Sequence, residues 1–283
     1  MKSKHIVNQF CHKNIKKKIS KISWVIDGRV QSIVGDTIEA YMPNSAIGSV
    51  ARIAVDNKAS GVLAQVVGFR GKNTILVPYS SIRGVRAGAI VSSMKQMDKI
   101  LAGNFLLGET IDGFGKVLSS NKKADNHQET NDLIDVEALA PNPLNRTKIS
   151  TPLSLGVKAI DGLTTFCEGQ RMGILAGSGV GKSILLGMIT RGSEADVKII
   201  GLIGERGREV REFIENEITP QIRQKTIVVV STGDQSPLLR IRAAKVATAL
   251  AEYFSSKGKK VLLMMDSLTR VAQAQREVGL SIG

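Results

Sequence analysis

The stretch Ala176-Gly-Ser-Gly-Val-Gly-Lys-Ser183 lies between a short apolar run, 172–176, and a segment with a helical pattern, 184–189. The order of strand, glycine-rich turn, Lys-Ser and helix is typical of a loop that binds the phosphates of a nucleotide. Glycines let such a backbone turn tightly and point successive N–H groups inward, where the N-terminus of the following helix also favours an anion. One position departs from the strict pattern, because Ala176 stands where glycine is usual.

The residues of this loop have separate expected roles. The loop backbone is expected to surround the phosphates through Gly177, Ser178, Gly179, Val180 and Gly181. The Lys182 ammonium can reach the β- and γ-phosphates, and the Ser183 hydroxyl can bind Mg²⁺. ATP and Mg²⁺ are therefore the expected ligands. The alternative, a glycine-rich turn that binds nothing, is disfavoured because Lys-Ser and both flanking segments are in register.

Composition limits the other possibilities. The chain has 283 residues, of which 42% are apolar, so it can form two domains with buried cores. Its aromatic content of 4% disfavours a base-stacking platform for single-stranded nucleic acid. Cys11 and Cys167 lie far apart without metal-ligand spacing, as expected of reduced thiols in the cytosol. No apolar run has the length of a membrane span, and the basic N-terminus is not expected to be a secretory signal, because no continuous apolar segment follows it.

The net charge of +14 permits attraction to nucleic acid, acidic lipids or an acidic protein, and charge alone does not choose among them. Part of this charge lies in segment 1–21, which has seven lysines and no acidic residue. Apolar residues recur in it at nearly helical spacing. Two interpretations stay open: a solvated basic tail, or an amphipathic helix that binds a partner or a membrane surface.

The chain divides into four parts. After segment 1–21, residues 22–95 contain short β-prone runs, at 24–26, 28–34, 37–41, 49–55, 62–67 and 74–77, separated by Gly, Asn and Asp. This spacing predicts a small closed β-barrel. Residues 96–150 form a connecting segment with a polar exposed loop at 119–132. Residues 151–283 form an α/β domain.

In the α/β domain, apolar runs at 197–203, 226–230 and 260–265 alternate with helical patterns. Continuous apolar strands alternating with helices predict a parallel sheet that is buried on both faces. The longest helix is expected to have Ser236 as its N-cap, Pro237 at its first position and Gly258 at its end.

Ligands of such sheets bind at the carboxyl ends of the strands. Asp266 closes an apolar strand there and is expected to hold Mg²⁺. Glu205 follows another strand and can polarise a water for attack on the γ-phosphate, as a general base. Arg206 could stabilise charge on the transferred phosphoryl group. The alternative for Glu205 and Arg206 is a surface pair at the start of a helix.

Three stretches together resemble one protein family. Gly204-Glu-Arg-Gly-Arg-Glu-Val-Arg-Glu-Phe213, the loop 176–183 and Asp266-Ser-Leu-Thr-Arg270 are similar to the flagellar and type III protein-export ATPases, which are relatives of the rotary ATP synthase catalytic subunit. The likeness extends from about Gly28 to Gly283. It implies a barrel followed by a RecA-like P-loop core, with ATP hydrolysis that drives protein export. It also implies that Arg270 contributes to nucleotide binding.

The resemblance also implies partners and a location. Members form hexameric rings in the cytoplasm, at the inner face of the bacterial membrane, and work with the export apparatus and exported proteins. A stator-like regulator usually binds the N-terminus, which suits segment 1–21. Peripheral membrane association is possible on this basis, and nucleic acid is disfavoured as a partner.

The family pattern continues beyond residue 283. The continuation supplies a core strand between the P-loop strand and the Asp266 strand, the adenine pocket, an arginine given to the neighbouring subunit, and a helical domain. We therefore expect an incomplete core that is not a competent ATPase by itself. Two alternatives remain: a noncatalytic remnant or assembly subunit, and a hexamer that translocates nucleic acid.

Overall fold

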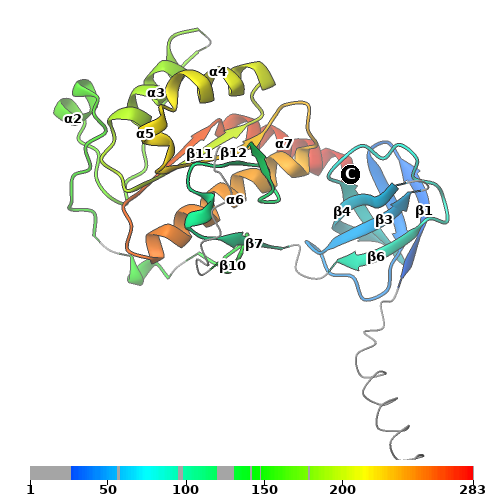
Figure 1. Cartoon of the computed structure of the whole chain (residues 1–283). Helices are drawn as coiled ribbons and strands as arrows, with labels where there is room; N and C mark the ends of the chain where they lie inside the picture. The colour runs from blue at the N-terminus through cyan, green and yellow to red at the C-terminus, as the bar shows by residue number, and fades with distance from the viewer. Residues whose placement is uncertain are drawn as a thin grey trace, which may run out of the picture.

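The computed structural model describes residues 27–282 except 56–57, 95–97, 120–130, 141, 147 and 178. The basic segment 1–21, the expected strand 24–26, Cys11 and most of the expected loop 119–132 lie outside the described residues. The described chain forms two bodies, a barrel and a layered α/β domain, which are joined by the segment that starts at residue 98 (Figure 1). Within the described residues, no helix is long and apolar enough to cross a membrane.

The first body is a closed antiparallel barrel with the strand order β1-β2-β5-β4-β3-β6. Its strands are β1 (Gly28–Val34), β2 (Thr37–Tyr41), β3 (Val50–Val55), β4 (Lys58–Arg70), β5 (Asn73–Pro78) and β6 (Ile90–Met94). Ile38, Ile53 and Leu76 are fully buried in its interior. The expected closed barrel is thus confirmed. Strand β6 was not predicted, because its paired serines interrupt the apolar alternation.

The second body contains a five-stranded sheet with the order β13-β11-β12-β8-β9. Its strands are β8 (Thr110–Ile111), β9 (Val117–Ser119), β11 (Val197–Ile203), β12 (Thr226–Ser231) and β13 (Val261–Asp266). All neighbours are parallel except β8 and β9. Every residue of β11 and β12 is buried, as predicted for central strands of a parallel sheet.

Helices cover both faces of this sheet. They are α2 (Lys158–Leu163), α3 (Lys182–Gly192), α4 (Gly207–Glu217), α5 (Pro220–Arg223), α6 (Pro237–Ser256) and α7 (Leu268–Ile282). Ile199 and Ile203 of β11 face the cluster that includes Leu250 of α6. The neighbouring β11 residues Ile200 and Leu202 lie in the cluster with α3 and α4. This alternation places α6 opposite α3 and α4 (Figure 1).

The segment 96–150, predicted to connect the domains, also supplies strands. Strands β7 (Lys99–Ala102) and β10 (Asp132–Asp135) form an antiparallel pair. Strand β8 extends the main sheet by pairing with β12, and the Gly108 amide donates to the Thr226 carbonyl at 2.7 Å. A strand of only two residues carries no periodic signal. It was not predicted, because it is defined by pairing with a strand more than 100 residues away in the chain.

The expected strand 172–176 is wrong, because these residues form no strand in the structure. Strand β13 is the edge of the sheet and pairs with β11. A strand exists by hydrogen bonding to a neighbour, and the described chain pairs none with 172–176. The Leu175 side chain is accordingly 99% exposed. An apolar run indicates burial but does not provide the neighbouring strand.

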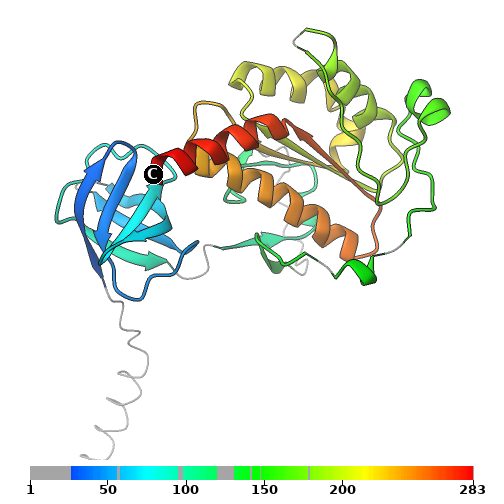
Figure 2. The ribbon, with the colours of Figure 1, turned by 180° about the vertical axis from the view of Figure 1, so that it is seen from behind.

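The two bodies meet at one end of α6 and α7. Figure 2 shows the C-terminal end of α7 reaching the barrel. Tyr79, which follows β5, is buried in a cluster with Leu238 of α6 and Val278 of α7. The Arg70 guanidinium donates to the Ile282 carbonyl at 3.4 Å. The barrel therefore contacts the same helices that pack on the five-stranded sheet.

Candidate nucleotide-binding site

The glycine-rich loop has the backbone shape that its sequence predicts. Gly179 and Gly181 have φ values of 75° and 91°, in the left-handed region that favours glycine. Gly181 is the N-cap of α3, and its carbonyl accepts from the Leu185 amide at 3.0 Å. A Cβ added at either glycine would meet no atom within 4 Å. The loop backbone at the start of α3 is therefore open to an approaching group.

Lys182 and Asp266 form an ion pair, although they lie 84 positions apart in the chain. Lys182 is the first residue of α3, and Asp266 is the last residue of β13. The Asp266 side chain is 10% exposed and the Lys182 side chain 30% exposed. The expected phosphate-binding cation and the expected metal-binding carboxylate thus lie together at the carboxyl edge of the sheet.

Glu205 belongs to the same cluster. Burial raises the pKa of its carboxyl, and the negative charge of Asp266 and a hydrogen bond with Glu209 raise it further. The Lys182 charge opposes this shift of the Glu205 pKa. A carboxylate with a raised pKa beside a lysine and an aspartate is a candidate general base. The structure therefore brings together three of the predicted residues.

The backbone around Glu205 is held in a specific shape. Gly204 has a φ of 76°, and its amide donates to the Ser231 carbonyl at 2.6 Å. A Cβ at Gly204 would lie 2.6 Å from the Arg270 Cβ. Glycine is thus required both by the left-handed backbone and by the side chain that packs on it.

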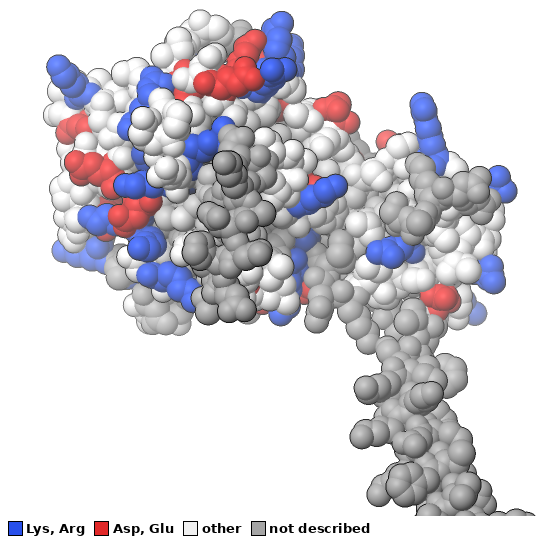
Figure 3. All heavy atoms as spheres, viewed as in Figure 1, with Lys and Arg blue, Asp and Glu red and all other residues white. Residues whose placement is uncertain are grey.

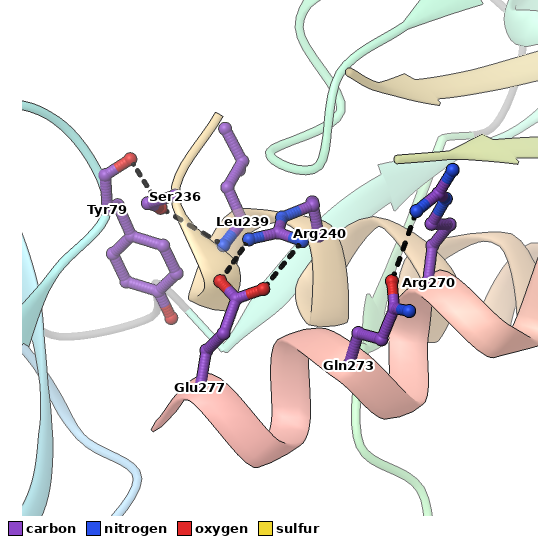
Figure 4. A network of polar contacts seen from close by, with 7 residues as sticks. All are labelled: Tyr79, Ser236, Leu239, Arg240, Arg270, Gln273 and Glu277. Atoms are coloured by element: carbon purple, nitrogen blue, oxygen red, sulfur yellow. Dashed lines mark hydrogen bonds and ion pairs between the residues drawn. The ribbon is translucent and has the colours of Figure 1, made fainter. Parts of the chain in front are cut away.

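The two predicted arginines have partners other than Lys182 and Asp266. Arg206 is 81% exposed at its side chain and forms an ion pair with Glu209 at 3.3 Å. Arg270 packs along Gly204 and donates to Gln273 at 3.2 Å (Figure 4). The sequence indicated that both residues are near the site, but the direction of a long surface side chain depends on neighbours that local sequence does not specify.

The oxygen donors at this edge suit magnesium. Ser183 is exposed in the first turn of α3, and the Asp266 carboxylate pairs with Lys182, the residue before Ser183. Within the described residues, no group of three or more His, Cys, Asp and Glu side chains could hold a metal ion. Mg²⁺ in phosphoryl-transfer sites uses one or two protein oxygens together with phosphate oxygens and waters. Ser183 and Asp266 therefore fit the ion as partners of a bound nucleotide.

Comparisons with known proteins identify the family of both bodies. Residues 156–283 match the nucleotide-binding domain of the ATP synthase alpha/beta family, and residues 30–95 match the beta-barrel domain of the same family. The chain belongs to the ATP synthase alpha/beta family. This family membership is consistent with the order of barrel, connecting segment and sheet described above.

Relatives within the family include export ATPases. The chain is 44% identical to the flagellum-specific ATP synthase of Bacillus subtilis, and the match covers 90% of the chain and 58% of that relative. It is 40% identical to the SPI-2 type 3 secretion system ATPase of Salmonella typhimurium, over 90% of the chain and 57% of that relative. The assembled ATPase EscN from enteropathogenic E. coli has a similar structure, with a TM-score of 0.82 and 44% identity, over 90% of the chain and 60% of EscN. The chain thus spans less than two thirds of the length of these relatives.

Two contacts at the candidate nucleotide-binding site were not predicted from the sequence. Glu209 bonds to Glu205, and its position four residues later at the start of α4 could have indicated this contact. Glu217 of α4 lies directly on Gly187 of the P-loop helix α3 and pairs with Arg191. This second contact joins two helices that are distant in sequence, so no local pattern indicates it.

Proposed function

We propose that the protein containing this chain hydrolyses ATP to drive protein export through a flagellar or type III secretion apparatus. The observation that carries the proposal is the convergence of Lys182, Asp266 and Glu205 at the carboxyl edge of the sheet, beside a left-handed glycine loop. A convergent cation, metal-binding carboxylate and base are the parts that phosphoryl transfer to water requires. The family and its named relatives support the same activity.

Each residue has a proposed role in this reaction. The loop 177–181 and Lys182 bind the phosphates and hold the γ-phosphate in place. Glu205 accepts a proton from the attacking water, for which its raised pKa is suited. Ser183 and Asp266 would hold Mg²⁺, which neutralises charge on the β- and γ-phosphates when bound.

The proposed roles of the arginines require movement of their side chains. Arg206 must exchange its partner Glu209 for the transferred phosphoryl group. Arg270 would contribute to nucleotide binding from the start of α7, and it packs on Gly204, next to the proposed base Glu205. Exposed ion pairs are worth about 0–1 kcal/mol, so leaving Glu209 costs Arg206 little.

We also propose a hexameric ring located in the cytoplasm at the inner face of the bacterial membrane. EscN has been determined as an assembled ATPase, and also in complex with its central stalk EscO. A stator-like regulator would bind segment 1–21, and the export apparatus and exported proteins would be the further partners. Nucleic acid is disfavoured as a partner, because an aromatic content of 4% provides few side chains for base stacking. On the face of the α/β body seen in Figure 3, basic and acidic side chains are interspersed.

A noncatalytic assembly subunit is the second candidate. The partners of Arg206 and Arg270 are Glu209 and Gln273, and this observation favours the alternative, because neither arginine is held toward the Lys182–Asp266 pair by these contacts. Binding and turnover distinguish the two candidates, because a noncatalytic subunit can retain a nucleotide without hydrolysing it.

The proposal is tested on the full-length protein that contains this chain. Glu205→Gln should bind Mg-ATP with almost unchanged affinity and hydrolyse it about 10²–10⁴-fold more slowly, as expected for loss of a general base. Lys182→Ala should instead lose affinity, because the phosphates lose a charge-assisted partner. Calorimetry and phosphate release measure the two effects. Equal loss of affinity and turnover in Glu205→Gln would place this residue in the binding pocket and reject its role as base.

A further inference from the structure

The turn between β12 and α6, residues 232–236, contacts both the barrel and the backbone of Glu205. At one end, the Ser236 hydroxyl donates to the Tyr79 carbonyl of the barrel at 2.8 Å (Figure 4). At the other end, the Gly233 amide donates to the Glu205 carbonyl at 3.1 Å. Only two residues separate these hydrogen bonds along the chain.

Internal hydrogen bonds make this turn stiff. The Thr232 amide donates to the Gln235 side chain at 3.1 Å, and the Gln235 amide donates to the Thr232 carbonyl at 3.1 Å. A hydrogen bond from Thr232 also lowers the pKa of the Asp234 carboxyl. A turn that is bonded to itself moves as a unit and does not bend between its ends. A displacement at Ser236 therefore reaches Gly233.

The barrel end of the connection is also fixed. Tyr79 is 4% exposed, its amide donates to the Leu63 carbonyl at 2.8 Å, and its ring packs edge-on against Phe114 at 5.1 Å between centroids. The same Ser236 oxygen accepts from the Leu239 amide at 3.3 Å and caps α6. Ser236 therefore joins a rigid point of the barrel to the first turn of α6.

A second contact, from α7, is made with Gly204, the residue before Glu205. Arg240 of α6 forms two hydrogen bonds with Glu277 of α7, at 3.3 and 2.5 Å (Figure 4). The same α7 carries Arg270, whose side-chain stem packs on Gly204. Gly204 thus approaches both Gly233 of the turn 232–236 and Arg270. The turn leads into α6 and Arg270 lies on α7, and both helices pack in one cluster with Tyr79 of the barrel.

We propose that the turn 232–236 couples the position of the barrel to Glu205, with Ser236 and Gly233 as positioning residues for hydrolysis. This inference rests on the proposed function, in which Glu205 is the general base. A shift of the barrel against α6 moves Ser236, then Gly233, and then the peptide that carries Glu205. The barrel would thereby regulate turnover without a contact to the nucleotide.

Two substitutions at Ser236 separate the bond to the barrel from the helix cap. Ser236→Asp keeps an oxygen that accepts from Leu239, but an ionised carboxylate cannot donate to the Tyr79 carbonyl. Ser236→Thr keeps both the donor and the acceptor. The full-length protein is studied in both forms, and hydrogen exchange is measured at the amides of Gly204 and Gly233 without nucleotide.

We expect exchange at these two amides to become about 5-fold faster in Ser236→Asp, the effect of one net hydrogen bond, and to stay unchanged in Ser236→Thr. The kcat for ATP hydrolysis should fall in Ser236→Asp with KM unchanged, whereas Ser236→Thr should keep the kcat of the natural protein. Unchanged exchange in Ser236→Asp, equal acceleration in both variants, or acceleration spread over β11 and β13 would overturn the coupling.

The exchange measurement keeps this inference separate from the proposed function. It needs neither nucleotide nor turnover, so a protein that fails to hydrolyse ATP still reveals whether Ser236 controls the Glu205 backbone. Conversely, unchanged ATP affinity in Lys182→Ala would reject the proposed site and leave the exchange result valid.

Discussion

The Lys182 ammonium and the Asp266 carboxylate are each other's partners, and together they join the start of α3 to the end of β13. Asp266 is 7% exposed as a residue, so its charge has little access to water. A carboxylate in this position needs a partner, because desolvation of an unpaired charge is unfavourable. Removal of one partner alone should therefore destabilise the fold, because it leaves a poorly solvated charge.

The first prediction is that substitutions of Lys182 and Asp266 have non-additive effects on the free energy of unfolding. Lys182→Met should lower the free energy of unfolding strongly in the natural background, because it leaves Asp266 unpaired. The same change should cost less in Asp266→Asn, where no charge is left behind. A double-mutant cycle by urea denaturation should give a coupling of about 0.5–3 kcal/mol. Additive effects of the two changes would contradict this ion pair.

A second prediction concerns Gly187 in the phosphate-loop helix. A Cβ at this position would overlap the Glu217 side chain, so Gly187→Ala must displace Glu217 and its ion pair with Arg191. Gly279 of α7 is the matched control, because a Cβ there meets no atom within 4 Å. Gly279→Ala should stabilise the protein by about 0.5–1 kcal/mol.

Gly187→Ala should not give the stabilisation expected for Gly279→Ala. The stabilisation should appear when Gly187→Ala is made in the Glu217→Ala background and compared with Glu217→Ala alone. Thermal unfolding of the four variants gives the comparison. Equal stabilisation by Gly187→Ala and Gly279→Ala would mean that Glu217 does not restrict the packing of α3 on α4.

Local sequence patterns predicted the central part of the fold. Strand β11 coincides with the predicted run 197–203, and α6 begins with the expected Ser236 cap and Pro237. Both features depend on periodicity and end signals within one segment. By contrast, 172–176 has the apolar composition of a strand but no paired neighbour in the described residues. Strand β8 pairs with β12, but its two residues are too few to show a strand pattern in the sequence. Strand pairing is a long-range property, so the sequence alone did not determine these two elements.

The candidate site divides in the same way. Residue types at strand ends indicated Lys182, Asp266 and Glu205, because parallel strands bring their carboxyl ends to one edge. Their mutual contacts, and the Glu209 bond that raises the Glu205 pKa, depend on side-chain directions that only the structure provides.

A third prediction uses the close approach of Gly233 to the base. A Cβ at Gly233 would lie 3.0 Å from the Gly204 carbonyl oxygen, whereas a Cβ at Gly207 meets no atom within 4 Å. Gly233→Ala should therefore displace the peptide before Glu205 and lower kcat in the full-length protein, with nucleotide affinity retained. Gly207→Ala, three positions after Gly204, should leave both unchanged. A similar loss of kcat in both variants would show general sensitivity of the region instead of a specific contact.

The last prediction concerns pH. Burial, Asp266 and Glu209 raise the pKa of Glu205, and hydrolysis requires its carboxylate form. The rate should therefore fall on the acidic side at a higher pH than an ordinary glutamate would give. Glu209→Gln removes a hydrogen bond and a charge that raise this pKa, so the acidic limb should move to lower pH. Asp266→Asn should lower the Glu205 pKa in the same direction, but it also alters the proposed metal-binding group, whereas Glu209→Gln leaves that group intact and removes the exposed ion pair with Arg206.

The raised pKa of Glu205 also affects stability, but in the opposite direction: the rate should rise with pH, whereas this contribution to the free energy of unfolding should fall. A raised pKa means that the folded state favours protonated Glu205, so this contribution is present at low pH and is lost as the pH rises through the folded pKa. Glu205→Gln removes the titration, and its unfolding free energy relative to the natural protein should therefore increase with pH across that range. Urea denaturation at several pH values measures this difference. A constant difference, together with an acidic limb that Glu209→Gln leaves in place, would show that Glu205 titrates as an ordinary surface glutamate and is not the base.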